Sequence, residues 1–196
     1  MKPINLPIFP LKLVVLPGTI QGLQIFEPRY LNMVKQCMSD ASNFVISYKS
    51  DRFDDFDFGI ERVGTSVQIV DFNNLPNGLL GITVKAEAKV SLNNIIQLED
   101  KSYLGQVLPL TEPEVDDQSL LAKYPDLIEV LTKLKEHPEI RTLQLDINLD
   151  SADSVSYHLG NLIPLTADEK QTLLTAFDAD QRFKILSKIL ESIRKT

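Results

Sequence analysis

The acidic segment SDRFDDFDFG, residues 50–59, holds the densest set of side chains that could do chemistry. Its carboxylates are Asp51, Asp54, Asp55 and Asp57. Carboxylate oxygens are the ligands that Ca²⁺ prefers, but the spacing misses the D-x-[DN]-x-[DN]-G loop and lacks a Glu at the twelfth position. We therefore expect a solvated acidic loop in which Phe53, Phe56 and Phe58 pack partly onto the fold. A metal site and an aromatic interaction loop are the alternatives.

Other catalytic patterns are missing or incomplete. No glycine is followed by lysine and no G-x-G-x-x-G occurs, so neither phosphate-binding loop is present. In GTSVQ (64–68), glutamine stands where a nucleophile elbow needs its second glycine, which favours a strand start. His137, His158 and Cys37 are too few for a structural zinc site, and we interpret them as helix-end, packed and core residues. The sequence predicts a non-enzymatic binding module with no cofactor and no metal.

Composition narrows the class of protein. The 196 residues are 43% hydrophobic and 24% charged, as in ordinary globular proteins, and the net charge of −7 opposes nucleic-acid binding. One cysteine excludes an intramolecular disulfide and fits a reducing compartment. The apolar start LPIFPLKLVVLPG (6–18) is broken by prolines and followed by no A-x-A-like site, so it is not a signal peptide. We expect a cytoplasmic protein without a membrane segment.

The predicted secondary structure, which must position any site, changes from strands to helices near residue 111. Before it, apolar runs at 43–49, 63–72, 79–92 and 103–110 predict strands, and NNLPNG (73–78) predicts a turn. One helix begins at Pro28, with Leu31, Val34 and Met38 on one face.

After the acidic linker 111–117, apolar residues recur at helical spacing. We expect helices over 124–137 and 151–163, one opened by a capping box of Thr166 and Glu169, and one from Asp178 to the end. The apolar face of the last helix is Phe183, Leu186, Ile189, Leu190 and Ile193. The predicted parts are residues 1–111, β-rich with one inserted helix, and residues 119–196, a helical bundle.

Three stretches resemble one known family. LPIFPLKLVVLPG followed by LQIFEPRYLNMV resembles the signature of the N-terminal substrate-recognition domain of Lon proteases. VGTSVQIVDFNNLPNG is similar to the family's G-T strand, turn and return strand, and LIPLTADEKQTLLTAFDADQRFKILSKIL resembles its closing helical pair. The resemblance implies an α+β fold, with a PUA-like β-barrel subdomain followed by an α-helical C-terminal subdomain.

The chain departs from the family in two ways. VKAEAKVSL places Lys89 and Val90 where family members usually show an arginine with an aromatic residue. It also ends at Thr196, before the ATPase and Ser-Lys protease modules, so we expect a stand-alone bacterial member without unfolding or proteolytic activity.

The resemblance implies binding of exposed hydrophobic segments. The expected partners are unfolded or partly folded proteins or peptides, together with a protease or chaperone; no membrane partner is expected, and RNA binding by a PUA-like domain is the alternative. The candidate binding residues are Phe26, Glu27, Arg29, Tyr30, Phe53 and Phe56. Glu27 and Arg29 flank Pro28 and are expected to pair. Phe26 is expected to be buried between strand and helix, so that Phe26→Ala would cost about 3–5 kcal/mol.

Overall fold

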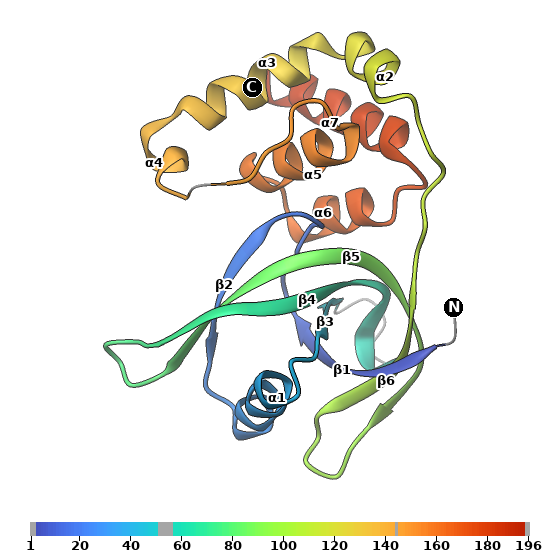
Figure 1. Cartoon of the computed structure of the whole chain (residues 1–196). Coiled ribbons are helices and arrows are strands. Elements are labelled where there is room, and N and C mark those ends of the chain that lie inside the picture. Colours follow the sequence, from blue (N-terminus) through green and yellow to red (C-terminus); the bar gives the residue numbers. More distant parts are fainter. Residues whose placement is uncertain (1–2, 51–56, 144, 195–196) are drawn as a thin grey trace. The chain divides into compact units, whose positions relative to one another are not determined.

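The computed structural model describes residues 3–50, 57–143 and 145–194 (Figure 1). The chain divides into two compact units, Met1–Leu110 and Thr111–Thr196, and each is described by itself. In the described residues, the first unit holds the sheet and one α-helix, and the second unit is helical. The predicted fold class, a β-barrel part followed by a helical part, is confirmed.

The strands of the first unit form a closed sheet. They are β1 (Ile4–Leu11), β2 (Ile20–Ile25), β3 (Phe44–Lys49), β4 (Ile60–Asn74), β5 (Leu80–Gln97) and β6 (Tyr103–Pro109). Within the described residues the order is β2-β5-β4-β3-β1-β6, and β5 also pairs with β6. Register shifts between β4 and β5, at Ser66/Val67 and at Ile69/Asp71, mark bulges that let the long strands bend.

β1 tolerates two prolines because of where its partners begin and end. Its pairing with β6 runs from Ile4 to Ile8, and its parallel pairing with β3 runs from Ile8 to Leu11. Among the described strands, Pro7 and Pro10 therefore each lie where β1 has a partner on one edge only, and a missing backbone N–H is tolerated at such positions.

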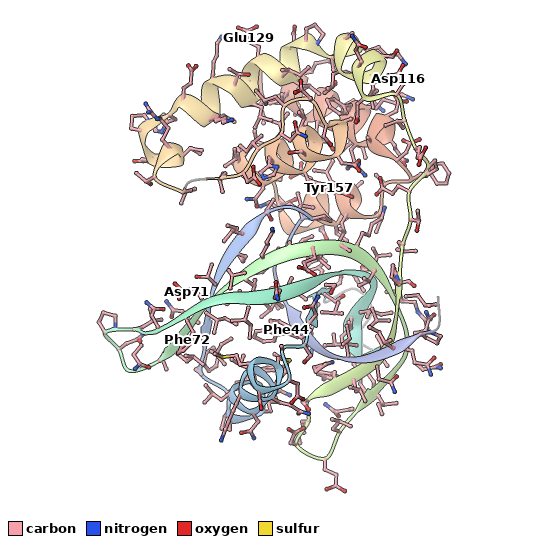
Figure 2. The ribbon with its side chains drawn as sticks, viewed as in Figure 1. Phe44, Asp71, Phe72, Asp116, Glu129 and Tyr157 are labelled. Atoms are coloured by element: carbon pink, nitrogen blue, oxygen red, sulfur yellow. The ribbon has the colours of Figure 1, made fainter. Side chains whose placement is uncertain are left out.

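β1 and β3 are buried on both faces. Ile8 and Val45 belong to one apolar cluster, whereas their neighbours Phe9 and Phe44 belong to a second cluster that includes α1. Successive residues of a strand point to opposite faces, so the continuous apolar runs of these strands fill two cores. Phe44 lies between the strands and α1 in Figure 2.

Helix α1 (Pro28–Ser39) packs on the sheet with a different face from the predicted one. Its buried residues are Tyr30, Met33, Val34 and Cys37. Of the predicted face, Val34 is buried, Leu31 is half-buried and Met38 is 40% exposed. The helix has two overlapping sets of apolar residues at helical spacing. The set that contains Tyr30 faces the core. Cys37 is a buried core residue, as predicted.

The β4–β5 hairpin and the segment before β4 use residues with positive φ. The hairpin turn closes through the Gly78 N–H donating to the Leu75 carbonyl at 2.9 Å, and Gly78 has φ 80°. The predicted Asn-Gly turn is confirmed, although β4 continues to Asn74. Before β4, a short turn η2 (Asp57–Gly59) places the Phe58 ring 5.3 Å from that of Tyr103. Phe58 thus packs partly onto the sheet, whereas Phe53 and Phe56 lie outside the described residues.

The second unit contains the predicted helices and two short ones. The helices are α2 (Asp117–Lys123), α3 (Pro125–Glu136), α4 (Pro138–Arg141), α5 (Ala152–Leu162), α6 (Ala167–Leu174) and α7 (Ala179–Arg194). The capping box of Thr166 and Glu169 is present. At α7, Asp178 accepts from the Gln181 N–H, while the Gln181 side chain accepts from the Phe177 N–H. α2 was not predicted: the Asp116 side chain caps it, inside the acidic segment interpreted as a linker.

A fully buried arginine on α7 joins α5 to the start of the second unit. Arg182 has no exposed surface, and its Nε donates to Ser156 Oγ at 2.9 Å. One Nη donates to Glu112 and the other to Asp153. Its guanidinium also lies 4.1 Å from the centre of the Tyr157 ring. The predicted apolar face of α7 omitted this residue, because a charged side chain is rarely placed in a core unless it is paired.

Tyr157 completes the network around Arg182. Its hydroxyl donates to Glu112 Oε1 at 3.0 Å, and burial raises its pKa, so the hydroxyl stays protonated. Every residue of α5 from Val155 to Gly160 is buried, which exceeds the single apolar face that periodicity predicted. The helix can be buried on all sides because the hydroxyl groups of Ser156 and Tyr157 accept hydrogen bonds from Arg182. Tyr157 is labelled on α5 in Figure 2.

Arg182→Met should destabilise the second unit strongly. Methionine keeps much of the side-chain volume but leaves Glu112 and its neighbours without their cation, which typically costs about 3–5 kcal/mol for a buried ion pair. Urea unfolding measures the loss. The matched control is Lys184→Met on the same helix, which removes an exposed pair with Asp180 and should cost less than about 1 kcal/mol. Equal losses of unfolding free energy in the two variants would show that the buried Arg182 network contributes no more to stability than an exposed ion pair.

Candidate functional site

Two grooves flank α1 in the first unit. The first, called here the hairpin groove, has a volume of about 290 Å³ and lies between the end of α1 and β4. It is lined by Cys37, Met38, Ala41, Ser42 and Gln68–Phe72. Three large apolar side chains of this lining stay open to solvent: Phe72 is 57% exposed, Val70 49% and Met38 40%. The hairpin groove is therefore an exposed apolar surface.

The β4–β5 pairing explains why Phe72 is available. Phe72 stands opposite Ile82 on β5, and Ile82 stands opposite Leu23 on β2. Ile82 and Leu23 are buried, whereas Phe72 lies near the hairpin tip and lacks full cover. In Figure 2, Asp71 and Phe72 lie on opposite sides of the hairpin, as expected for neighbours on a strand. The bulge between Ile69 and Asp71 adds Val70 to the same exposed region.

The second groove, called here the β1 groove, has a volume of about 480 Å³. Its walls are α1, the first half of β1, and the turn between β5 and β6. The residues that line it are Asn5–Pro7, Arg29, Asn32, Met33, Gln36, Cys37, Asp40, Ser42, Leu98, Asp100 and Ser102–Leu104. Cys37 and Ser42 line both grooves, so the two surfaces adjoin at the end of α1.

The predicted ion pair stands at the start of α1. Arg29 Nη2 lies 2.6 Å from Glu27 Oε2, and Arg29 Nε donates to the same oxygen at 2.9 Å. Arg29 Nη1 also donates to the Lys101 carbonyl, which ties α1 to the β5–β6 turn. In that turn, hydrogen bonds from Ser102 and the nearby Arg29 charge lower the pKa of Asp100, which keeps the carboxylate ionised. Glu27 and Arg29 thus position one wall of the β1 groove.

The structure distinguishes Phe26 from Tyr30, the two predicted aromatic binding residues that lie within the described part of the chain. Tyr30 is only 3% exposed and its ring lies 4.2 Å from that of Phe9, so it is a core residue rather than a contact surface. Phe26 is 67% exposed, so the prediction that it is buried is wrong. The reason is strand alternation: Leu23 and Ile25 of β2 point inward, which turns Phe26 outward.

The described residues show little that suits catalysis. Among them, no group of three or more His, Cys, Asp or Glu residues is placed to hold a metal ion. Burial raises the pKa of the Cys37 thiol, which disfavours the nucleophilic thiolate. His158 is buried in α5 with Nδ1 2.8 Å from the Ser154 carbonyl oxygen. Gly64 lies within β4, as predicted, where an added Cβ would meet the Ile46 carbonyl at 2.7 Å.

Comparison with known proteins identifies the family. The sequence profile of the ATP-dependent protease La (LON) substrate-binding domain matches residues 5–192. This chain belongs to the LON substrate-binding domain family. The crystal structure of a Lon N-terminal domain protein from Xanthomonas campestris is 27% identical, with a TM-score of 0.73, covering 94% of this chain and 98% of that one. The N-terminal domain of the Mycobacterium avium complex Lon protease shares the fold at 17% identity, with a TM-score of 0.71, covering 93% and 96% of the two chains.

Two Lon proteases show how much of the relatives the match spans. The Lon protease of Brevibacillus choshinensis is 25% identical over 97% of this chain and 25% of its own length. Lon protease 1 of Thermus thermophilus is 25% identical over 98% of this chain and 25% of its own length. The Lon-family chain thus spans about a quarter of these proteases. In the described residues, no helix is both long enough and apolar enough to cross a membrane.

Sequence reasoning missed the exposed residues of the hairpin groove. Val70 and Phe72 fall in VQIVDFNN, which was interpreted only as a strand and a turn. The sequence did contain a pattern that indicates this exposure. Apolar residues continue along β4 up to the turn, and side chains near the tip of a hairpin have few neighbours to bury them. Asn5, Asn32 and Gln36, whose carboxamides line the β1 groove, belong to no recognisable sequence motif.

Phe26→Ala should leave the free energy of unfolding within about 0.5 kcal/mol of the parent protein, because the lost ring is largely exposed. Thermal and urea unfolding measure the difference. Ile25→Ala is the matched control on the neighbouring residue, and it should cost about 2–5 kcal/mol because Ile25 is 1% exposed. A large loss in the Phe26 variant would contradict the outward orientation.

Tyr30→Phe should reduce the sensitivity of the fold to alkali. Burial raises the Tyr30 pKa from 10.0 to about 12. Below pH 10 the phenol is protonated in both folded and unfolded chains, so its contribution to stability is fully present. Between pH 10 and 12 only the unfolded chain releases the proton, and about 2–3 kcal/mol of stability is lost. Urea unfolding at pH 8 and pH 11 should show a smaller loss for the variant, and equal losses would contradict the assignment.

Proposed function

We propose that this LON-family domain is a non-enzymatic module that binds exposed hydrophobic segments of unfolded or partly folded proteins. The observation that carries the proposal is the hairpin groove, where Met38, Val70 and Phe72 remain open to solvent. Folded proteins rarely leave adjacent large apolar side chains uncovered unless the surface has a partner. Membership of a substrate-binding domain family agrees with a protein ligand.

The affinity would come from apolar burial. Complete burial of one large apolar side chain is worth roughly 1.5–3 kcal/mol, and association costs at least several kcal/mol of lost freedom. A groove with three partly exposed side chains therefore supports weak, sequence-tolerant binding that several adjacent contacts would strengthen. Phe26 adds a further exposed ring at the end of β2, and β2 pairs with β5 alone among the described strands. An extended peptide could add to that edge.

RNA binding is the competing function, and two observations disfavour it. The net charge of −7 repels phosphates, and the residues that line the hairpin groove include Asp71 but no lysine or arginine. We further propose a cytoplasmic location, supported by the single buried cysteine, and a protease or chaperone as the partner that accepts the captured segment.

Phe72→Ser should weaken binding of a fluorescently labelled unfolded protein, β-casein, by about tenfold, because a large ring leaves the contact. The matched control is Phe177→Ser, which removes a ring that is 69% exposed in the second unit and should leave binding unchanged. Fluorescence anisotropy gives both dissociation constants, and thermal unfolding shows that both variants stay folded.

The same titration at low and physiological salt separates the two functions. Binding driven by apolar burial should change little with salt, whereas RNA binding should weaken by orders of magnitude through counterion release. Tight, salt-sensitive binding of labelled single-stranded RNA, without measurable casein binding, would overturn the proposal.

A further inference from the structure

The β1 groove presents three side-chain amides that have no hydrogen-bond partner among the described residues. Asn5 lies on β1, and Asn32 and Gln36 lie on α1; all three line the groove and are exposed. None of these side chains forms a hydrogen bond to another residue in the described part of the chain. Each carboxamide offers a donor and an acceptor, the same pair of groups that a peptide bond presents.

The spacing of the two α1 amides matches an extended chain. Asn32 and Gln36 are one helical turn apart, which is a rise of about 6 Å at 1.5 Å per residue. In an extended segment, peptide groups facing the same side recur every two residues, or roughly 6.6 Å. Asn32 and Gln36 can therefore pair with successive peptide groups along one edge of an extended ligand.

The opposite wall has an open strand edge. β1 pairs with β6 over Ile4–Ile8, but its pairing with β3 begins only at Ile8. The Ile4–Pro7 part of β1 thus has one edge without a strand partner among the described residues, and Asn5–Pro7 line the groove. Pro7 contributes a carbonyl but no N–H to this edge, and the remaining backbone groups of the segment are a template for another extended chain.

The floor and the charges of the groove define the side chains it would accept. Pro7, Met33 and Leu104 supply an apolar floor. The Arg29 cation is already bound by Glu27 and the Lys101 carbonyl, which leaves the carboxylates of Asp40 and Asp100 as the charges of the rim. The groove therefore favours neutral or basic side chains and disfavours acidic ones.

We propose that the β1 groove binds the backbone of an extended polypeptide segment through the side-chain amides of Asn32, Gln36 and Asn5. This inference rests on the proposed function, since it takes the same unfolded ligand. It assigns a different task to each groove: the hairpin groove holds apolar side chains, and the β1 groove pairs with peptide groups. The two adjoin at Cys37 and Ser42, so one segment can occupy both. Recognition of peptide groups predicts binding that depends little on the sequence of the ligand, apart from the disfavoured acidic side chains.

The test compares two labelled peptides of the same sequence, one unmodified and one N-methylated on every residue of its central segment, so that neither edge of the extended chain keeps its donors. Both peptides alternate leucine or valine with polar residues and carry one lysine. N-methylation removes backbone donors while the side chains stay the same. The unmodified peptide should bind the parent protein about tenfold more tightly than the methylated one, the effect of one or two hydrogen bonds.

The double variant Asn32→Ala/Gln36→Ala should bring that tenfold ratio close to one. Its matched control is Lys35→Ala/Ser39→Ala, which changes exposed residues of the same helix outside the groove and should keep the ratio. Asn5→Ala, on the opposite wall, should reduce the ratio independently of any effect on α1. Phe72→Ser should weaken both peptides equally and leave the ratio unchanged.

The outcomes separate this proposal from the broader one. If both peptides bind and the ratio is the same in the parent protein and the double variant, the β1 groove does not recognise the backbone, and only this inference fails. If neither peptide binds the parent protein, both proposals fail. If Phe72→Ser abolishes the ratio while Asn32→Ala/Gln36→Ala retains it, backbone recognition belongs to the hairpin groove instead.

Discussion

The first unit depends on a single strand that pairs at both of its ends. β5 lies beside β2 over its first residues and beside β6 over its last, while β4 accompanies it for most of its length. Because β6, at the far end of the strand order, pairs back onto β5, the sheet closes on itself; the long strands β4 and β5 must bend, and the bulges in their ladder permit the bend. The same closure makes the β4–β5 hairpin extend past the sheet and turns Phe72 into a surface residue. It also leaves the start of β1 with one open edge.

The second unit contains a buried charge network within its apolar core. A buried arginine without partners would be very costly, and Arg182 is tolerated because Glu112, Asp153, Ser156 and Tyr157 satisfy its donors. The network requires specific geometry. A planar guanidinium donates hydrogen bonds to partners in its own plane, and an aromatic ring can stack only against its face. α5, α7 and the segment after β6 are thereby fixed in one relative register, which apolar side chains alone specify less sharply.

The sequence predicted the elements better than the surfaces. Local chemistry was sufficient for Pro28 at the start of α1, for the Asn-Gly turn and for the Thr166 capping box, since each acts over a few residues. It was insufficient for Arg182, whose partners are as far as 70 residues away in sequence. It was misleading for Phe26, where family resemblance drew attention to the motif and strand alternation decided the orientation. The grooves beside α1 depend on where the pairing of β3 with β1 and β4 ends. No local sequence pattern encodes the ends of these long-range pairings.

The distance along the chain between paired groups has a consequence for synthesis on the ribosome. β1 finds its β6 partner only after about a hundred residues have been made, since Ile4 pairs with Val107. Glu112 emerges soon afterwards but meets Arg182 only when α7 follows. The nascent first unit can therefore close while the helical segment is still without its cation, and units that fold in this order do so one after the other. A growing chain therefore holds Glu112 and Asp153 without the Arg182 cation until α7 leaves the exit tunnel, so the charge network is among the last parts of the second unit to form.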